Sequence, residues 1–276
     1  MKGDELNFKE KYYTNYKKNK SALCIGIDIH NELLPQNFKL DSFLKSMIDN
    51  TSDLVCAYKP NIAFFEKRGS EGIELLKKTI AYIPKDVPII LDAKRGDIGS
   101  TAEAYADAAF NYFAADAVTL NPYFGLDSIA PFLKYKDKHI FVLCRTTNNS
   151  SNEIQNILLQ NNKKLYQEIA SLANKWNHAD NIGLVVGATF PQEAREIRNI
   201  CKDMIFLVPG IGNQGGDTKE IVQAINTDSN SPTMIISSSR SIMYAGNNDE
   251  ADISKYMNDI RNAAQLMNNH INQYNK

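Results

Sequence analysis

Four charged residues directly follow an apolar run in the stretch "VPIILDAKRGDIGST", residues 87–101. They are Asp92, Lys94, Arg95 and Asp97. Asp92 and Lys94 are two positions apart, so in a β-strand both side chains point to the same side, roughly 6.5–7 Å apart along the chain. Apolar Ile90 shares that orientation. The spacing therefore predicts that the Asp92–Lys94 pair lies over the core of a sheet or barrel.

A second lysine, Lys59, closes another apolar run, "LVCAYKP". If the two strands are neighbours, Lys59 faces the same space as Asp92 and Lys94. A structural ion pair is the ordinary interpretation of any single aspartate–lysine pair. However, removing each charge from water costs on the order of several kcal/mol even after relaxation. A cluster of two lysines and at least two aspartates is therefore better explained by function than by a structural plug.

The residue types in this cluster favour decarboxylation. A permanently charged lysine stabilises a developing anion and then donates a proton to it. A carboxylate beside that lysine repels an anionic group on the substrate. Together the two groups are suited to the loss of a carboxylate and the protonation of the resulting carbanion.

Two other kinds of chemistry fit the cluster less well. A metal site at Asp28, Asp92 and Asp97 is conceivable, but Lys59 and Lys94 would repel a divalent ion. A Schiff-base lysine needs a depressed pKa, whereas flanking carboxylates keep the ammonium group charged. The 4 histidines fall in loops, on helices or at the first residue of a strand, so none is expected among the strand ends.

The whole chain alternates between short apolar runs and helix-like segments. The predicted strands are 22–28, 54–60, 87–94, 116–122, 139–146, 182–189, 204–210 and 233–239. The predicted helices are 40–49, 71–83, 101–113, 126–135, 164–176, 191–202, 218–226 and 253–271. Such alternation predicts parallel strands joined by crossover helices. An open doubly wound sheet is the rival, but eight units in a chain of this length match an α/β fold of the (β/α)₈ TIM barrel type. We expect one domain over 1–276, with an extra helix in the N-terminal segment.

The composition excludes several function classes. The chain has 276 residues, 43% of them hydrophobic and 23% charged, which suits a large buried core. Its 31 basic and 32 acidic residues give no bulk charge for nucleic acid or an anionic membrane. No secretory signal or membrane-spanning run is evident. The scattered Cys24, Cys56, Cys144 and Cys201 indicate buried thiols and a cytoplasmic protein.

Polar residues gather at the ends of the predicted strands. The residues at these ends are Asp28, Lys59, Asp92, Lys94, Asn121, Thr146, Thr147, Pro209 and Arg240, and all of them except Pro209 are polar. In a TIM barrel the carboxyl ends of the strands carry the active site. The Asn- and Ser-rich segment 146–162 follows the fifth strand at that same end. It is either a solvated loop or a lid, and its position favours the lid.

A glycine-rich stretch, "VPGIGNQGGDT", follows the seventh strand. Gly210, Gly212 and Gly215 spell G-x-G-x-x-G, but the acidic residue that a dinucleotide site needs at the end of the following strand is absent, and Arg240 is there instead. In barrels the loops after strands seven and eight commonly hold a phosphate. Arg240 adds a fork of donors for phosphate oxygens. The sequence predicts a monophosphate ligand that carries a carboxylate some distance away.

The chain resembles the orotidine 5′-phosphate decarboxylases. The shared strings are "GIDIH", "YKPNIAFFE", "LDAKRGDIGST", "TLNPYFG", "VPGIGNQGGD" and "SSSRSIMYAG", in the family's order. The D-x-K-x-x-D pattern is highly specific, and the longer string resembles the group found in mycobacteria, many other bacteria and, in part, malaria-type parasites. The resemblance implies the last step of UMP synthesis, a carbon–carbon lyase reaction without cofactor or metal.

The resemblance also implies a role for each matching residue. Lys59, Asp92, Lys94 and Asp97 correspond to an alternating charge tetrad, with Lys94 as the proton donor to C6. The family is dimeric, so Asp97, Ile98 and Thr101 would reach into the site of a second subunit. The other expected substrate contacts are Asp28 and Asn61 to ribose, Thr147 or Thr146 to the pyrimidine, Pro209 against the base, Gln214 between phosphate and base, and Gly212, Ser239 and Arg240 at the phosphate.

This sequence departs from the family at two positions. Ser239 stands where the family often has Gly before the arginine, and a Pro common near residues 146–151 is absent.

Three alternatives remain for the function. Related magnesium-dependent sugar-phosphate decarboxylases keep D-x-K-x-x-D but place an acidic residue near the end of strand two, where this chain has Lys59. A non-catalytic phosphate sensor, or a barrel plugged by charges for structural reasons, would have no need for the full tetrad.

Overall fold

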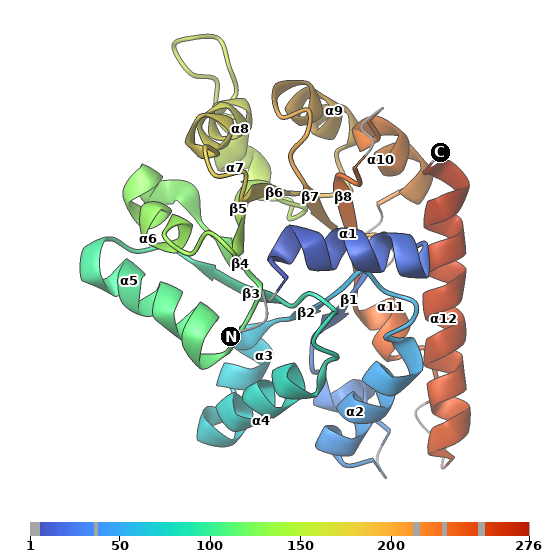
Figure 1. The fold of residues 1–276 in the computed structure, drawn as a ribbon. Helices are drawn as coiled ribbons and strands as arrows, with labels where there is room; N and C mark the ends of the chain where they lie inside the picture. The colour runs from blue at the N-terminus through green and yellow to red at the C-terminus, as the bar shows by residue number, and fades with distance from the viewer. Residues whose placement is uncertain (1–5, 36–37, 212–215, 228–230, 248–251, 276) are drawn as a thin grey trace.

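Eight parallel strands form a closed ring in the structure, a computed structural model that describes residues 6–35, 38–211, 216–227, 231–247 and 252–275. The strand order is β2-β1-β8-β7-β6-β5-β4-β3, and isolated parallel bridges Tyr58–Ile89 and Asn61–Asp92 join β2 to β3. The strands are β1 Leu23–Ile27, β2 Ala57–Pro60, β3 Ile90–Arg95, β4 Ala117–Leu120, β5 His139–Arg145, β6 Ile182–Val186, β7 Phe206–Pro209 and β8 Met234–Ser238. The predicted TIM barrel is therefore confirmed (Figure 1).

Helices surround this ring and connect consecutive strands. The longer ones are α1 Phe8–Asn19, α2 Leu40–Thr51, α4 Gly69–Tyr82, α5 Gly99–Asp107, α8 Leu165–Trp176, α9 Pro191–Ile200, α10 Thr218–Ile225 and α12 Ile253–Tyr274. The shorter ones are α3 Ile62–Glu66, α6 Ala130–Leu133, α7 Ser151–Gln155 and α11 Arg240–Met243. Two 3-10 segments, η1 Asn31–Leu33 and η3 Pro122–Ser128, and the π-helical turn η2 Ala108–Tyr112 complete the helical structure of the described residues. Figure 1 shows the longer helices around the barrel, except α1, which lies across one end of it.

Several helix boundaries differ from the prediction. The helix expected over 101–113 ends at Asp107 and continues as the π-helical turn η2. The segment expected as one helix over 126–135 is divided between η3 and α6. The short helices α3, α7 and α11 were not predicted, because four or five residues hold too little periodicity and are stable only through tertiary contacts.

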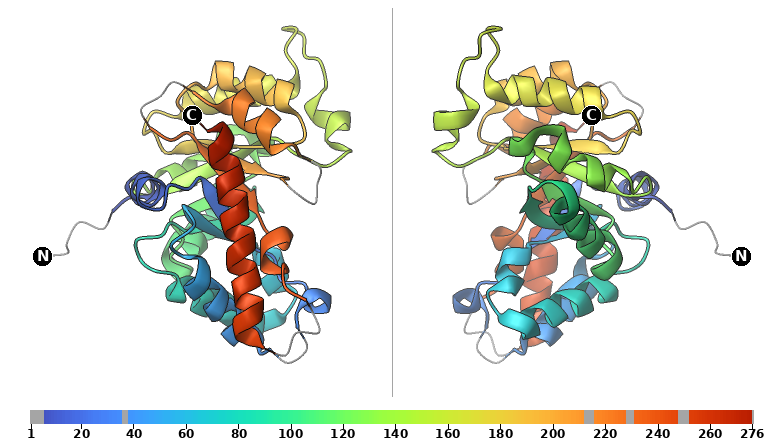
Figure 2. Two further views of the ribbon diagram at one scale, coloured as in Figure 1. Left: turned by 90° about the vertical axis from the view of Figure 1, so that its right-hand side faces the viewer. Right: turned by 90° about the vertical axis from the view of Figure 1, so that its left-hand side faces the viewer.

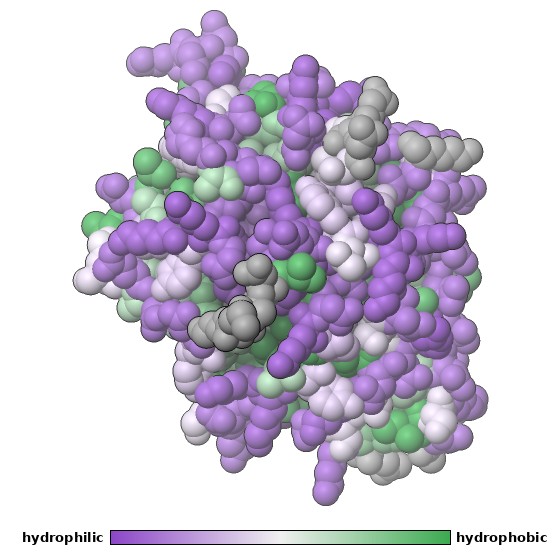
Figure 3. Space-filling view, in the orientation of Figure 1, coloured by the Kyte–Doolittle hydropathy of each residue, from purple (hydrophilic) through white to green (hydrophobic). Residues whose placement is uncertain are grey.

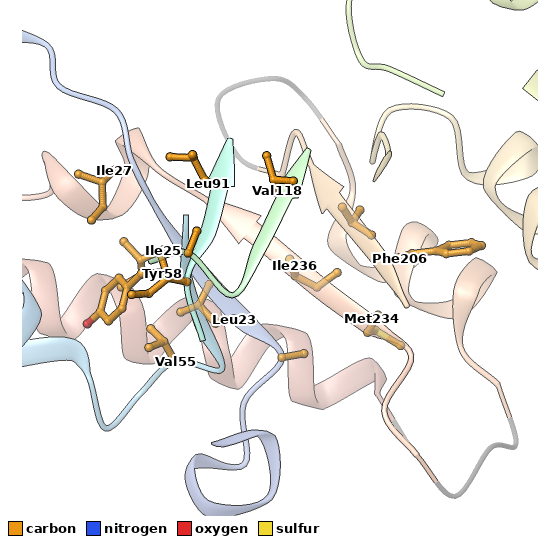
Figure 4. Close-up of a cluster of buried hydrophobic side chains, with 14 of the residues drawn as sticks. Leu23, Ile25, Ile27, Val55, Tyr58, Leu91, Val118, Phe206, Met234 and Ile236 are labelled. Atoms are coloured by element: carbon orange, nitrogen blue, oxygen red, sulfur yellow. The ribbon is translucent and has the colours of Figure 1, made fainter. Parts of the chain in front are cut away.

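Alternate residues of each strand face two different cores. Leu23, Ile25 and Ile27 of β1 belong to the core between the strands and the helices, as Figure 4 shows. Cys24 belongs to a second cluster inside the barrel, together with Ala57 of β2. Both faces of the strands are therefore buried along most of their length, which explains why the strands read as continuous apolar runs.

The extra helix predicted in the N-terminal segment is α1, and it covers the amino end of the barrel. Its side chains Phe8 and Tyr12 are buried in the cluster inside the barrel. The Tyr12 hydroxyl donates to the carbonyl of Met234 at 2.6 Å, and the Phe8 ring stacks on His139 with centroids 4.7 Å apart. Figure 2 shows α1 on one side of the barrel and α7 on the other, and the face that carries α1 is predominantly hydrophilic in Figure 3. Among the described helices, none combines the length and apolarity that crossing a membrane requires.

Candidate active site

A cavity of about 520 Å³ opens at the carboxyl ends of the strands. Ten residues predicted to form the site line it: Asp28, Lys59, Asn61, Asp92, Lys94, Thr146, Thr147, Pro209, Ser239 and Arg240. Between them these residues come from or directly follow β1, β2, β3, β5, β7 and β8. The ring of strands thus gathers side chains that are up to about 210 positions apart in the sequence, as parallel strands of a barrel must.

Asp92 is the centre of the charged cluster. Its Oδ2 accepts a hydrogen bond from Lys59 Nζ at 2.8 Å, and its Oδ1 accepts one from Lys94 Nζ at 2.6 Å. The side chains of Lys59 and Asp92 are only 7% and 9% exposed, whereas that of Lys94 is 50% exposed. The cluster therefore joins one deeply buried cation to one that reaches into the open cavity.

The buried charges hold each other in their ionised forms. Burial raises the pKa of the Asp92 carboxyl, but the positive charges of Lys59 and Lys94 outweigh that effect and hold it well below its usual range. Burial likewise lowers the pKa of Lys59, but the carboxylates of Asp92 and Asp28 reverse the effect and raise it above the ordinary value. Asp92 is therefore an anion, and Lys59 a cation, throughout the physiological range.

The backbone at Lys94 differs from the regular strand that the spacing predicted. Lys94 has a φ of 46°, in the left-handed region, and the pairing of β3 with β4 is irregular between Leu91 and Arg95. The hydroxyl of Thr119 compensates, because it accepts hydrogen bonds from Ala93 N at 3.0 Å and Lys94 N at 2.9 Å. The same hydroxyl donates to Asp92 Oδ1 at 3.0 Å. A strained conformation of this kind is typical of functional sites.

Asp28 and Asn61 lie beside the cluster, at the ends of β1 and β2. Asp28 Oδ1 is buried and has no hydrogen-bond partner among the described residues. A buried carboxylate oxygen without a donor is costly, so this atom is suited to accept a hydrogen bond from a ligand hydroxyl. Asn61 caps α3 by accepting from Ala63 N at 3.2 Å, which fixes its side chain at the cavity wall.

The two threonines after β5 differ in their hydrogen bonding. Thr146 Oγ1 accepts from Gln155 Nε2 at 2.8 Å and donates to Asn148 Oδ1 at 2.7 Å. No hydrogen bond within the described part of the chain engages the hydroxyl of Thr147, which also lines the cavity. Thr147 is therefore the one whose hydroxyl is free for a ligand.

The opposite end of the cavity carries the residues expected at a phosphate. Gly210 has a φ of 101°, which favours glycine and turns the chain sharply after β7. The Ser239 side chain occupies space that is open only because residue 26 is glycine, since a Cβ at Gly26 would overlap Ser239 Oγ. The guanidinium of Arg240 is exposed and makes no ion pair with the rest of the described chain. Gly212 and Gln214, which were also predicted here, lie outside the described residues.

Three predicted residues lie away from this cavity. Asp97 is partly exposed, and its Oδ1 accepts a hydrogen bond from the backbone N–H of Ile98 at 2.8 Å. Ile98 is 54% exposed although it is a large apolar residue. Thr101 on α5 is exposed as well. Within this chain none of these three residues lines the cavity that holds Lys94.

Three residues that structure the site were missed in the sequence. Thr119 is the single polar residue in the run "AVTL" of β4, a pattern that also suits an ordinary strand. Gln155 lies in the segment that was interpreted as a loop or lid. Arg145 is the last residue of β5, and its charge at a strand end was the signal that could have found it. Across the described residues, no group of three or more His, Cys, Asp or Glu side chains is placed to hold a metal ion.

A ring of eight parallel strands with a charge-lined cavity at their carboxyl ends defines the class of (β/α)₈-barrel enzymes. Comparison with known families narrows this class. The model of the orotidine 5′-phosphate decarboxylase / HUMPS family matches residues 21–256, which is more than half of the chain. The chain belongs to that family.

Relatives and solved structures agree with this assignment. The chain is 48% identical over 244 residues to orotidine 5′-phosphate decarboxylase of Herpetosiphon aurantiacus, covering 86% of this chain and 90% of the relative. It is 44% identical to the enzyme of the same name from Ralstonia nicotianae, covering 98% and 99%. The structure of Leishmania donovani OMP decarboxylase superimposes with a TM-score of 0.84 at 36% identity, covering 98% and 99%. Leishmania donovani UMP synthase superimposes with a TM-score of 0.87 at 38% identity, covering 98% of this chain but only 57% of the longer one.

Proposed function

We propose that this chain converts orotidine 5′-phosphate to UMP and carbon dioxide, the last step of UMP synthesis, without a metal ion or organic cofactor. The observation that carries the proposal is the array in which Asp92 accepts hydrogen bonds from Lys59 at 2.8 Å and from Lys94 at 2.6 Å at the mouth of the barrel. The names of the relatives support the same substrate.

In the proposed mechanism Asp92 acts as a fixed negative charge. The substrate carboxylate at C6 is bound against Asp92, and the repulsion between the two anions is relieved as carbon dioxide leaves. The positive charges of Lys59 and Lys94, together with their hydrogen bonds, keep Asp92 ionised against the effect of burial, because they hold the pKa of its carboxyl well below its usual range. Asp92 therefore does not escape the repulsion by taking up a proton.

Lys94 completes the reaction. Breaking the bond between C6 and the carboxylate leaves an electron pair at C6, and the ammonium group of Lys94 stabilises this charge. A proton then passes from Lys94 Nζ to C6, which forms the C–H bond of UMP. Since the Lys94 side chain is 50% exposed, solvent can return the proton.

The remaining polar residues would hold the substrate in register. We assign the ribose hydroxyls to the unpartnered Asp28 Oδ1 and to Asn61, and the pyrimidine to Thr147, with Pro209 against the base. The phosphate is assigned to Arg240 together with Ser239, Gly212 and Gln214. Binding energy gained at the phosphate would hold the carboxylate against Asp92.

We further propose that the active form is a homodimer. Asp97 is partly exposed and Thr101 is exposed, and Ile98 exposes apolar surface that a second subunit would cover. In that arrangement Asp97 of one subunit completes the tetrad of the other.

We also propose that residues 1–276 act as one catalytic domain in the cytoplasm, where the buried thiols of this chain stay reduced.

An ultraviolet assay with orotidine 5′-phosphate in the presence of EDTA tests the reaction. We expect loss of the orotate-type absorbance and formation of UMP. Turnover that requires added magnesium would instead assign the chain to the magnesium-dependent sugar-phosphate decarboxylases. Binding without turnover under both conditions would leave a phosphate-binding barrel.

Mixing two inactive variants tests the shared site. Lys94→Ala and Asp97→Ala dimers are each expected to be inactive, but hybrid dimers would hold one site with both native residues. Random exchange of subunits should restore about a quarter of the wild-type sites. If Asp97 acts within its own subunit, the mixture stays inactive.

A further inference from the structure

Arg145 is the largest fully buried side chain in the described chain, and it carries a charge. It ends β5, where its Nε donates to Glu193 at the start of α9 and its guanidinium lies over the Phe190 ring, 3.7 Å from the centroid. A buried arginine is tolerated only when its N–H groups find partners. One carboxylate satisfies one of its donors, so the other donors need partners elsewhere.

The remaining donors of Arg145 hold the short helix α7. Nη1 donates to Ser151 Oγ and, at 3.1 Å, to Gln155 Oε1, while Nη2 donates to Asn152 Oδ1 at 2.7 Å. An isolated helix of five residues is not stable in water. The position of α7 at the rim of the barrel therefore depends on its hydrogen bonds to Arg145, which form within this chain.

These contacts continue into the wall of the cavity. Gln155 Oε1 also accepts from the backbone N–H of Thr146 at 2.9 Å, and Gln155 Nε2 donates to Thr146 Oγ1 at 2.8 Å. Thr146 Oγ1 in turn donates to Asn148 Oδ1 at 2.7 Å. Gln155, Thr146 and Asn148 all line the cavity.

The charge of Arg145 fixes the direction of this chain of hydrogen bonds. A guanidinium can only donate, so the amide oxygen of Gln155 must face it and the amide nitrogen must face Thr146. The Thr146 hydroxyl accepts from that nitrogen and directs its own proton to the oxygen of Asn148. The amide NH₂ of Asn148 is then left as a hydrogen-bond donor.

We infer that Arg145 is a positioning residue for the base: through Gln155 it holds the wall formed by residues 146–148 as a donor surface for the carbonyl oxygens of a 2,4-dioxopyrimidine. The inference rests on the proposed function, and it makes α7 a fixed part of the wall, which differs from the lid that the sequence suggested. A pyrimidine that carries an amino group at C4 presents donors to the same wall and is disfavoured.

Ligand selectivity tests the inference separately from folding. We would measure the dissociation constants of UMP, CMP and inorganic phosphate for the wild type and for Gln155→Glu. The carboxylate still accepts from Arg145 but cannot donate to Thr146, so the hydrogen bonds of the wall reverse while α7 stays in place. We expect the preference for UMP over CMP to fall by about tenfold or more, the size of one lost hydrogen bond, with phosphate binding within about twofold.

A second variant removes the buried ion pair as a whole. Arg145→Met combined with Glu193→Gln leaves no unpaired buried charge, and we expect kcat/KM for orotidine 5′-phosphate to fall by about tenfold or more with the same loss of UMP preference. Arg198→Lys is the matched control, because Arg198 is also buried but lies at the amino end of the barrel. It should lower the melting temperature and leave the UMP preference unchanged.

Either of two results would overturn the inference. One is an unchanged UMP-to-CMP ratio in folded Gln155→Glu, and the other is an equal weakening of UMP and inorganic phosphate in both variants, which would indicate a general loss of structure. Because the ratio is a binding measurement, it stands apart from the proposed reaction. Absence of turnover by the wild type would refute the reaction, while a wild-type UMP preference that disappears in Gln155→Glu would still support the wall.

Discussion

The two ends of the barrel each bury an arginine, and the partners of the two arginines are different. At the amino end Arg198 donates to the backbone carbonyls of Cys201, Lys202, Met204, Ile225 and Thr233 and lies 3.5 Å from the centroid of the Phe206 ring. At the carboxyl end Arg145 contacts a carboxylate and the side chains of α7. The hydrogen bonds of Arg198 to backbone carbonyls stabilise the loops at the amino end. The hydrogen bonds of Arg145 to side chains instead determine which groups of the cavity wall donate and which accept.

The same contrast extends to the charges around them. Burial lowers the pKa of Arg198 to about 10, which still leaves the guanidinium charged at neutral pH. Neighbouring carbonyls satisfy it without any counter-charge. At the carboxyl end, Lys59 and Lys94 share Asp92, so positive and negative charges alternate beside open space. Stability and chemistry are therefore separated along the barrel axis.

Lys94→Ala should have the largest effect on activity. This effect should be confined to the chemistry at the carboxyl end of the barrel and should leave stability nearly unchanged. We expect kcat to fall on the order of 10³-fold or more, because both proton donation and stabilisation of the carbanion are lost. The unfolding free energy should change little, since the side chain is half exposed. Steady-state ultraviolet assays and urea unfolding measure the two quantities. Activity near the wild-type level would remove Lys94 from the mechanism.

Asp92→Asn should affect both activity and stability. It would therefore identify a residue at the carboxyl end that contributes to folding as well as to chemistry. Loss of the repelling anion is expected to lower kcat by about 10²-fold or more. The buried Lys59 then lacks its main counter-charge, and breaking a buried pair in this way costs about 3–5 kcal/mol. A variant with wild-type stability would contradict the burial argument even if its activity is lost.

Tyr12→Ala tests the amino end. Tyr12 belongs to α1 and is fully buried against the inside of the barrel, so the cavity left by its ring should lower the unfolding free energy by about 3–5 kcal/mol. Tyr12→Phe loses only the hydrogen bond to Met234 and should cost about 1 kcal/mol. For both variants we expect an unchanged kcat/KM below the melting transition. A changed kcat/KM would mean that the two ends are coupled.

The pH dependence of stability should show the smallest effect. The pKa of Asp92 is held below its ordinary value of about 3.9, so its contribution is present above that pH and is lost as the pH falls through the folded-state pKa. The pKa of Lys59 is raised above about 10.4, so its contribution is present below that pH and is lost as the pH rises through the folded-state pKa. Between these limits the contribution of the pair should be constant.

Lys59→Met sharpens this prediction. Removing one cation lets the pKa of Asp92 rise, so acid unfolding should begin at higher pH than in the wild type. Lys18→Met is the control, because Lys18 pairs with Asp86 on the surface, where the two side chains are 62% and 48% exposed. If acid unfolding begins at the same pH in the two variants, the buried pair contributes no more to acid stability than the surface pair does.

Much of the fold was predictable because alternation of apolar runs and amphipathic helices reflects burial on two faces. The boundaries that failed were those of short elements. Helix α7, with five residues, has no periodicity that distinguishes it from a loop, and only the contacts from Arg145 explain it. The site was predictable where polarity interrupts a strand end, as at Lys59 and Asp92.

Residues that act through a neighbour were not predictable from their type or spacing. Thr119 accepts a hydrogen bond from the backbone N–H of Lys94, but threonine is β-branched and is common in β-strands of any function. Gln155 is one of several amides in a polar segment, and nothing in its sequence position marks it as the partner of Thr146. Such roles depend on distances between elements, which spacing within one element does not contain.

The repeat of strands and helices, the charged residue types at the strand ends and the family of the chain follow from the amino-acid sequence alone, because burial patterns and strand spacing are local properties. The folded chain adds that Lys59 and Lys94 share the two oxygens of Asp92, that Lys94 has a left-handed backbone conformation, and that Arg145 is buried where it holds α7. These features arise when the ring of strands closes and brings distant side chains within hydrogen-bonding distance.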